Sequence, residues 1–267
     1  MTYHVLTWPE VALAATLVLL NGAISLAFGL RLERSLAIAA LRMIVQLGLI
    51  GIVLKALFAS GSPLATAAFA SVMGLAAAFE VMSRQERPIR GWPAHLLSGA
   101  TPFVAGLAGT LFAMLLVVHP DPWYGPRFFL PILGMIAGNA MSGVSLTLNT
   151  LTEAVARERI ALEARIALGE TRFAALAGPL GKALRTGLMP ILNAMAAAGI
   201  VSLPGMMTGQ ILSGIDPIEA SKYQIVIMFL IAGSTALAVT AAGVGVVLLL
   251  TDERHRLRLD RLLPPPS

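Results

Sequence analysis

Long apolar runs recur along the whole chain, from residue 11 to residue 250, and this recurrence limits the folds open to it. A helix needs about 20 mostly apolar residues to cross the roughly 30 Å hydrocarbon core of a bilayer. Because no water is present there, each backbone polar group must be bonded within the helix. Seven stretches have the required length and composition: 11–30, 37–58, 63–82, 94–118, 128–148, 188–212 and 223–250. The sequence therefore predicts an all-α, polytopic membrane protein with about seven transmembrane helices.

Composition agrees with this prediction. Hydrophobic residues make up 57% of the chain and charged residues only 12%, against roughly 25% charged residues in a typical soluble domain. No soluble stretch is long enough to fold separately, so we predict one membrane domain over residues 1–267. The chain has no cysteine, which excludes disulfides, thiolate metal sites and thiol nucleophiles.

Basic residues are distributed unevenly around the seven stretches. Of the 19 Lys and Arg residues, all except Arg42, Lys55, Arg127 and Lys222 fall on one side when the stretches cross the membrane alternately. Lys and Arg accumulate on the cytoplasmic side of spans. The distribution therefore predicts a multi-pass protein with its N-terminus outside and its C-terminus in the cytoplasm.

The C-terminal tail, 252–261, is rich in arginine. Basic residues beside a span are attracted to anionic lipid headgroups. We interpret the tail as a cytoplasmic, lipid-facing anchor and not as a nucleic-acid site. The expected partners therefore include the lipid bilayer and no nucleic acid.

One long connection, 149–187, carries a helical pattern of its own and is predicted to be cytoplasmic. Glu153 with Arg157, and Arg159 with Glu163, are four residues apart and can pair along a helix. Apolar residues recur at the spacing of one helix face: Val155, Leu162, Ile166, Phe173 and Leu176. The pattern indicates an amphipathic segment. Amphipathicity alone does not distinguish a segment that docks a partner from a helix that lies on the membrane surface.

Glycine and proline divide this segment. Gly169 lies near its middle, and Gly178 is followed directly by Pro179. Both features are typical of helix ends. We therefore expect short helices separated by turns at these two places.

Residues that could carry catalysis are scattered. His4, His95, His119 and His255 do not lie at metal-ligand spacing, and no carboxylate falls in the middle of a span. No nucleophile with a base, and no metal with ligands, can be assembled from the sequence. We predict that the chain is not an enzyme, that it has no cofactor of its own and that any metal ligands are unknown.

Two predicted spans carry polar residues that are candidates for a translocation path. Arg42 and Gln46 lie four apart on one face of the second stretch, which suits a polar path or a hydrogen bond between helices. Asn139 lies in the fifth stretch beside Gly134 and Gly138, whose GxxxG spacing favours tight helix packing. Path and packing therefore remain alternatives at each position.

The sixth stretch contains a predicted break. Proline removes a backbone hydrogen bond and glycine loosens the following turn, so a helix interrupted in the membrane is expected there. Irregular backbone at that depth is tolerated where protein or a water-filled cavity satisfies it, which makes the break a candidate binding or gating element. A simple proline kink is the alternative. The candidate path residues here are Ser202, Pro204, Gly205, Met206, Met207 and Gln210.

The motif EARIALG, which begins at Glu163, resembles the EAA loop of ABC-transporter permeases. In that superfamily the loop inserts into a cleft of the ATP-binding subunit. The sequence departs from the usual pattern at the third position, where Arg165 replaces alanine, and Pro179 comes slightly early. The resemblance implies that Glu163, Ala164 and Gly169 dock an ATPase, and we add Arg165 as a coupling residue.

Further segments extend the resemblance over nearly the whole chain. RMIVQLGLIG (42–51), GMIAGNAMSGVSL (134–146) and GIVSLPGMMTGQILSGIDPIEASKYQIVIMFLI (199–231) resemble the FetB-type permease family. Members of that family have seven spans and work with a separately encoded cytosolic ATPase. Its best-described bacterial member is implicated in iron export, and plant relatives are linked to aluminium tolerance and nucleotide-sugar transport. The resemblance places the SLPGMMTGQ segment at the functional centre.

The resemblance implies the membrane subunit of an ABC exporter in the inner membrane, with iron or another metal as substrate. Two copies of this chain would assemble with two ATPase subunits, which would bind the ATP and magnesium. An organic substrate such as a nucleotide sugar remains an alternative. A self-powered secondary transporter explains the spans and the break but not the organised cytoplasmic segment.

Overall fold

The computed structural model describes residues 7–263, and this part of the chain is helical, with isolated bridges and no strands. The chain divides into two compact units, Met1–Ser62 and Pro63–Ser267. The all-α prediction is confirmed. The prediction of one membrane domain over residues 1–267 stays a prediction.

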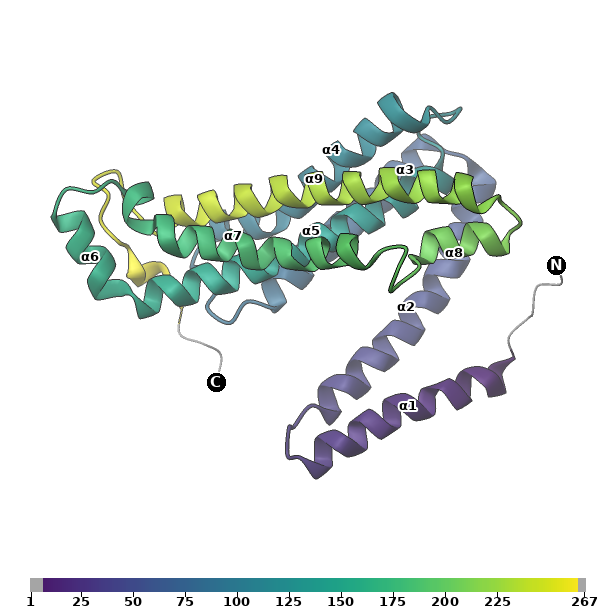
Figure 1. Ribbon diagram of the computed structural model, residues 1–267, viewed down its shortest axis with the longest axis horizontal. Helices are drawn as coiled ribbons and strands as arrows, with labels where there is room; N and C mark the ends of the chain where they lie inside the picture. The colour runs from purple at the N-terminus through teal and green to yellow at the C-terminus, as the bar shows by residue number, and fades with distance from the viewer. Residues whose placement is uncertain (1–6, 264–267) are drawn as a thin grey trace. The chain divides into compact units, whose positions relative to one another are not determined.

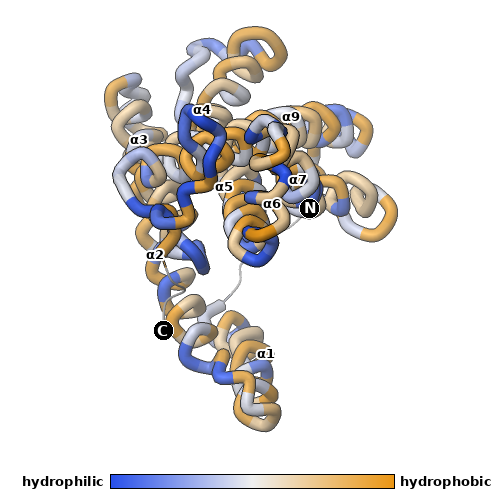
Figure 2. The backbone as a smooth tube through the Cα atoms, turned by 90° about the vertical axis from the view of Figure 1, so that its left-hand side faces the viewer, coloured by the Kyte–Doolittle hydropathy of each residue, from blue (hydrophilic) through white to orange (hydrophobic). Residues whose placement is uncertain are grey.

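The first unit is a pair of helices, α1 (Trp8–Ala27) and α2 (Glu33–Ser60). Their connection is closed by Ser25, whose hydroxyl donates to the Glu33 carboxylate at 3.0 Å and accepts from the Leu32 N–H at 2.9 Å. Almost all apolar side chains of both helices are exposed, and Figure 2 shows this apolar composition along α1. Such a surface is typical of helices that face lipid.

The second unit contains the remaining helices (Figure 1). The long helix α5 is central and packs against α3, α4, α7 and α9. α4 continues into a π-helical turn, η1. The bounds are α3 Pro63–Ser83, α4 Trp92–Phe112, η1 Ala113–Val118, α5 Pro126–Arg157, α6 Arg159–Ala167, α7 Arg172–Ala197, α8 Gly205–Leu212, α9 Pro217–Leu249 and the short 3-10 helix η2 Leu259–Arg261.

The backbones of α5 and α7 approach each other closely in this unit. A Cβ atom added at Gly143 would lie 2.8 Å from the Gly187 carbonyl oxygen, so only glycine permits this approach of the two backbones. By contrast, a Cβ atom at Gly138 would meet nothing within 4 Å. A Cβ atom at Gly134 would lie 3.2 Å from the Met73 side chain of α3. Of the two glycines of the predicted GxxxG spacing, Gly134 therefore packs closely and Gly138 does not.

Among the described residues, six helices are long and apolar enough to cross a membrane: α1, α2, α3, α4 with η1, α5 and α9. They coincide with six of the seven predicted stretches. The seventh, 188–212, is not one helix, since α7 ends at Ala197 and α8 begins at Gly205. The predicted break in this stretch is therefore confirmed, and α7 with α8 takes the place of a single span.

Two expectations for the 149–187 segment need correction. α5 runs on to Arg157, so the segment begins as a continuation of that helix. Gly178 and Pro179 do not end a helix, because α7 passes through both. The turn at Gly169 is present, between α6 and α7.

Candidate functional site

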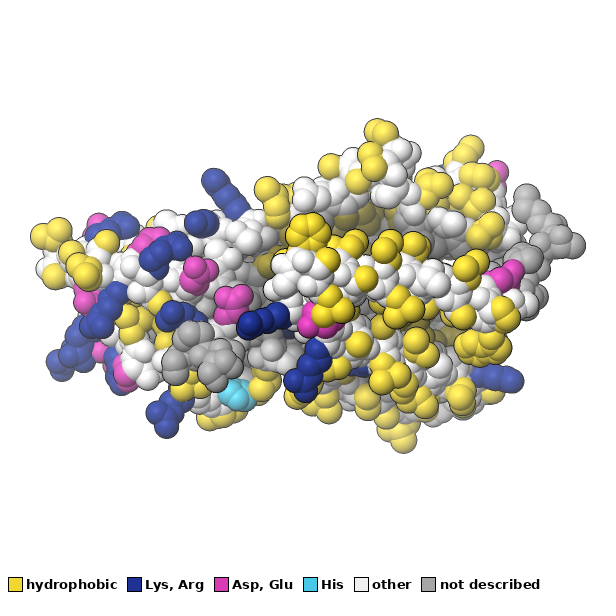
Figure 3. Space-filling model, turned by 90° about the horizontal axis from the view of Figure 1, so that it is seen from below, with side chains coloured by type: hydrophobic (Ala, Val, Ile, Leu, Met, Phe, Trp, Pro, Cys, Tyr) yellow, Lys and Arg dark blue, Asp and Glu magenta, His cyan; other side chains and the backbone are white. Residues whose placement is uncertain are grey.

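Charged side chains gather at the end of the second unit that carries α6 (Figure 3). Hydrogen bonds join the connections that meet there. Asn149 of α5 donates to the Arg84 carbonyl at 2.9 Å and accepts from the Glu86 N–H at 3.2 Å. The Arg90 N–H donates to the Arg261 carbonyl of the C-terminal tail at 2.6 Å. The charge distribution assigns three segments to one side: the α3–α4 connection, the C-terminal part of α5 with α6, and the tail. These segments lie at one end of this unit.

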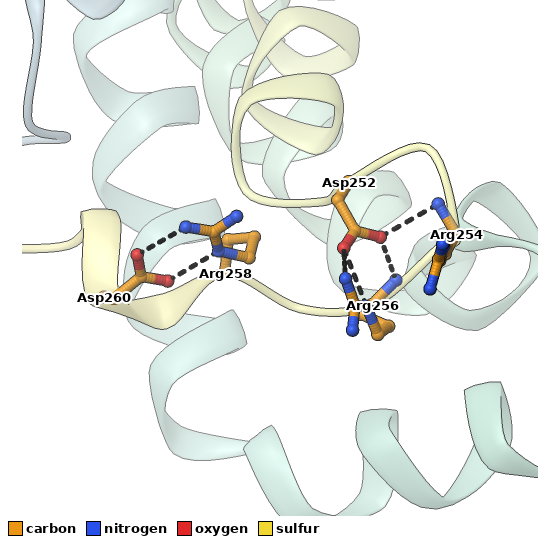
Figure 4. Close-up of polar contacts among 5 residues, drawn as sticks. All are labelled: Asp252, Arg254, Arg256, Arg258 and Asp260. Carbon is orange, nitrogen blue, oxygen red and sulfur yellow. Dashed lines mark hydrogen bonds and ion pairs between the residues drawn. The ribbon is translucent and has the colours of Figure 1, made fainter.

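The tail is tied to itself by two carboxylates (Figure 4). Asp252 accepts from the N–H groups of Arg254 and Arg256 at 2.9 Å, and its other oxygen lies 2.7 Å from the Arg256 guanidinium. Asp260 pairs with Arg258 at 2.9 Å. Both guanidinium groups remain partly exposed, and the lipid-facing anchor stays a prediction.

The same contacts set the acidity of the two carboxyl groups. Burial raises the pKa of Asp252, but the hydrogen bonds from Arg256 and Arg254 outweigh it and leave that pKa below its ordinary value. The hydrogen bond from Arg258 lowers the pKa of Asp260, and burial opposes this only in part. Both carboxyl groups are therefore ionised at neutral pH.

Helix α6 has a buried face and an exposed apolar face. Leu162 is 2% exposed and belongs to the core cluster that also contains Val155 and Leu176. On the outside, Ile160 is 84% exposed and Leu168 at the following turn is 87% exposed. Of the apolar residues predicted to share a face in this segment, Val155, Leu162 and Leu176 are buried, Ile166 is partly buried and Phe173 is exposed. These two exposed apolar side chains of Ile160 and Leu168, one on the anchored helix and one just after its end, are candidates for contact with a protein partner.

Arg165 fastens α6 to α7. Its guanidinium donates to the carbonyls of Ala174 and Ala175 at 2.9 Å each and lies 2.7 Å from the Glu170 carboxylate. The Ala175 carbonyl is the one that the N–H of residue 179 would bond in an unbroken helix, and Pro179 has no N–H. Arg165 thus satisfies a carbonyl that Pro179 leaves unbonded, and this allows α7 to continue through the proline.

The two departures from the usual EAA pattern are therefore related. The two side chains of Arg165 and Glu163 are about equally exposed but make different contacts: Arg165 reaches α7 and positions α6, whereas Glu163 pairs within α6 with Arg159 at 2.9 Å. Ala164 is exposed as well. Of the predicted coupling residues, Glu163 and Ala164 are open to a partner, and Arg165 is a positioning residue.

Gly169 makes the turn between α6 and α7. Its φ of +97° is a conformation that residues with a side chain rarely adopt. Its N–H donates to the Ile166 carbonyl at 2.9 Å, and Thr171 caps α7 by accepting from the Ala174 N–H at 3.3 Å. The conformation and the cap together fix the direction in which α7 leaves the corner.

The break between α7 and α8 lies at the other end of α7. The Ala197 carbonyl accepts from the N–H groups of Val201 at 3.0 Å and Ser202 at 3.1 Å, and Gly199 has a φ of +83°. Ile200 and Val201 are exposed by 91% and 82%. The loop 198–204 is therefore a compact turn that presents apolar side chains outward.

Two cavities lie beside this break. The smaller, of about 300 Å³, is lined by residues of α5, α7, α8 and α9 and by the break itself. The larger, of about 460 Å³, lies between α7, the break, α8 and α9. Of the predicted path residues, the smaller cavity brings together Asn139, Ser202, Pro204, Gly205 and Met206, whereas the larger includes Pro204 and Met207.

Gln224 of α9 lines both cavities and was missed by the sequence reasoning. It is 8% exposed, and its Oε1 atom has no hydrogen-bond partner among the described residues. Met228, four residues later and so on the same helix face, lines both cavities as well. This four-residue spacing within the 199–231 segment is the signal that could have identified the pair.

The remaining predicted path residues lie elsewhere. Arg42 and Gln46 belong to α2 of the first unit, and their role in a path stays a prediction. Gln210 of α8 lines neither cavity, although its Oε1 atom is buried without a partner in the described structure. Its backbone carbonyl accepts from the Ser213 and Ile215 N–H groups at the end of α8.

Comparison with known proteins gives relatives along most of the chain. Residues 8–249 match the uncharacterised protein family UPF0014. The chain is 35% identical to the UPF0014 membrane protein slr1647 of Synechocystis over 80% of this chain and 82% of that protein. It is 31% identical to the probable iron export permease protein FetB of Escherichia coli over 98% and 99%. It is 33% identical to protein ALUMINUM SENSITIVE 3 of Arabidopsis thaliana over 85% and 81%. No solved structure matches the chain.

Proposed function

Because the chain belongs to the uncharacterised protein family UPF0014, a family of multi-pass membrane proteins, we propose that it is the membrane subunit of an ATP-driven exporter. A separate cytosolic ATP-binding subunit would supply the energy and would hold the ATP and magnesium. Two copies of the chain would form the membrane part of the complex. In this proposal the chain itself is not an enzyme and has no cofactor.

The α6 corner is the observation that carries the proposal. A nine-residue helix is anchored by Leu162 and Arg165 and exposes Ile160 and Leu168 at the end of the unit where the charged connections meet. ATP binding would bring the two ATPase subunits together and move α6. α7 would carry that movement to the break, and the cavities beside it would open alternately to the two sides.

The cargo that we propose is a metal cation. Iron is the first candidate, because a relative that matches nearly the full length is named a probable iron export permease. The cavities beside the break are the proposed path, with Gln224 as an added path residue. A nucleotide sugar or another organic substrate, and a self-powered transporter, are the outcomes that the following test separates from this proposal.

The test is co-purification of the chain with the ATP-binding subunit encoded beside it. In the docking variant Ile160→Ser/Leu168→Ser both exposed apolar side chains are lost, and we expect the ATPase to be lost with them. The matched control is Val72→Ser on α3, which removes an apolar side chain that is 58% exposed away from the α6 corner. Membrane insertion of all three chains is measured in parallel.

The complex is then placed in lipid vesicles, and ATP hydrolysis is followed with and without added metals. Hydrolysis stimulated by a metal supports metal export. A complex that binds but responds only to an organic compound moves the proposal to the organic substrate. If the wild-type chain binds no ATPase and transports a substrate by itself, the ATP-driven assignment is wrong.

A further inference from the structure

We propose that the two cavities beside the break form a thioether site for a soft, monovalent metal cation of the Cu(I) or Ag(I) type. The smaller cavity is lined by Met135 of α5, Met206 of α8 and Met228 of α9. Three helices that are separate in sequence thus each contribute one methionine to the lining of the same space. Thioether sulfur selects soft cations, above all Cu(I).

The larger cavity repeats this composition. Met195 of α7 and Met207 of α8 line it together with Met228, which is shared with the smaller cavity. Five of the 12 methionines in the chain therefore lie around these two spaces. Since Met228 borders both, a cation could pass from one set of sulfur ligands to the other without losing all of them.

Gln224 supplies an oxygen to the same place. Its side chain is more than nine-tenths buried, lines both cavities and has an Oε1 atom without a partner in the described structure. A buried carbonyl oxygen with no hydrogen-bond donor is energetically unfavourable. A cation in either cavity would satisfy that oxygen, which a purely apolar ligand could not do.

The lining carries no charge, and this decides between kinds of cation. Neither cavity has an Asp, Glu, His, Lys or Arg among its lining residues. Hard and borderline divalent or trivalent ions bind through carboxylate oxygens and imidazole nitrogens. Removing a cation from water becomes more unfavourable as its charge rises. The polar lining residues are neutral: Gln224, with Asn139 and Ser202 in the smaller cavity and Ser221 in the larger. A neutral site of methionine sulfur with a few amide and hydroxyl oxygens therefore suits a soft ion of single charge better than iron, which favours charged oxygen and imidazole ligands.

Methionine also fills gaps in apolar cores, because its side chain is flexible and polarisable. That role predicts filled space, whereas these five side chains border open cavities and an unpartnered oxygen. As a binding site the proposal stands on this geometry alone. As the site of the exported ion it rests on the ATP-driven export proposed above and replaces iron, the first candidate there, with a soft monovalent cation.

Binding is measured on the purified full-length chain in lipid nanodiscs without any ATPase. Ag(I) is titrated by calorimetry, and Cu(I) by competition with a chromogenic chelator. The test variant is Met135→Leu/Met206→Leu/Met228→Leu, since leucine keeps the volume and removes the sulfur. The control variant is Met43→Leu/Met82→Leu/Met141→Leu, whose methionines line neither cavity. We expect affinity to fall at least about tenfold, or 1.4 kcal/mol, in the test variant only.

Two further measurements keep the result interpretable. If the triple variant does not fold, the single variant Met228→Leu is compared with Met141→Leu. Methyl NMR of 13C-labelled methionine should show that Ag(I) shifts the signals of Met135, Met206 and Met228. The proposal is overturned if the wild-type chain binds neither ion, if both triple variants lose binding equally, or if Fe(II) binds more tightly than Cu(I). Because no ATPase is present, failure of the partner assignment would leave these results unchanged.

Discussion

The two ends of α7 are built in opposite ways. At its beginning, Arg165 and Thr171 satisfy backbone groups, so the α6–α7 corner is held by polar contacts. At its other end, the α7–α8 break exposes Ile200 and Val201 and adjoins the unpartnered oxygen of Gln224. The polar groups at the beginning of α7 are hydrogen-bonded, whereas the Gln224 Oε1 atom beside its other end has no hydrogen-bond donor in the described structure.

This difference indicates that the two ends of α7 have different roles. A corner whose polar groups are satisfied resists deformation and can pass on a movement imposed from outside. A break with an unsatisfied polar group has something to gain from a ligand. The following predictions test the contrast, beginning with the variant for which we expect the largest effect.

Arg165→Met should damage the corner most. It removes the donors for the Ala174 and Ala175 carbonyls. Because the Arg165 side chain is partly exposed, water can replace part of these hydrogen bonds, and we expect the free energy of unfolding to fall by about 2 kcal/mol. ATPase docking should be lost as well. Thermal unfolding in detergent and co-purification measure the two effects.

Arg159→Met is the control, since its exposed pair with Glu163 should contribute less than about 1 kcal/mol. The relation to Pro179 is tested by a double-mutant cycle. In a Pro179→Ala background residue 179 regains its N–H, so Arg165→Met should be less destabilising there. Equal effects in both backgrounds would show that Arg165 does not compensate for the proline.

Gly169→Val should disturb the direction of the corner. At a φ of +97° a β-branched residue is strained, and we expect a loss of about 1–2 kcal/mol together with loss of ATP-driven export. Membrane insertion should be unchanged. Vesicle transport and unfolding measure the outcome. Normal export by this variant would show that Gly169 is not a coupling residue.

The matched glycine for this experiment is Gly178. It lies within α7, and an added Cβ atom would meet nothing within 4 Å. Gly178→Ala should therefore stabilise the chain by about 0.5–1 kcal/mol. A loss of stability there would mean that α7 is not continuous through Pro179.

Gln224→Leu should act in the reverse direction at the break. Removal of the unpartnered Oε1 atom should leave stability unchanged or raise it by about 1 kcal/mol, because a buried polar group is replaced by an apolar one. Transport should fall despite the more stable fold. Reduced stability together with normal transport would show that Gln224 is a structural residue.

Asp252→Asn should have the smallest effect and concerns only the tail. Its folded pKa lies below the ordinary value of 3.8, so the Asp252 contacts stabilise the tail above that pH and are lost as the pH falls through the folded pKa. Wild-type protection of the Arg256 N–H from hydrogen exchange should therefore decrease on acidification below this range. The asparagine variant should lack this pH dependence, and an identical pH profile would rule out Asp252 as its origin.

The sequence predicts the helices better than it predicts their ends. Six long apolar stretches match helices because length and hydrophobicity alone decide them. The course of α7 through Pro179 could not be predicted, since it depends on a hydrogen bond from Arg165, ten residues from the carbonyl that it reaches. Local rules treat that proline as a terminator.

The candidate site was partly predictable for the same reason. Pro204 and Gly205 mark the break by their effects on the backbone, which a sequence shows directly. Gln224 and Met135 become site residues only when α5 and α9 pack beside the break. Their roles depend on contacts between segments that are distant in the chain, and no local pattern states those contacts.

The continuity of α7 has a geometric consequence. Its 26 residues form a rod of about 39 Å, in which each residue advances about 1.5 Å and turns about 100°. One residue inserted anywhere between Gly181 and Gly187 would change no side chain at either end, yet would rotate one end against the other by that angle and move it by about 1.5 Å. The orientation of the break about the α7 axis is therefore fixed relative to that of the corner. We therefore expect coupling between the corner and the break to depend on the number of residues between them as much as on the identity of any of those residues.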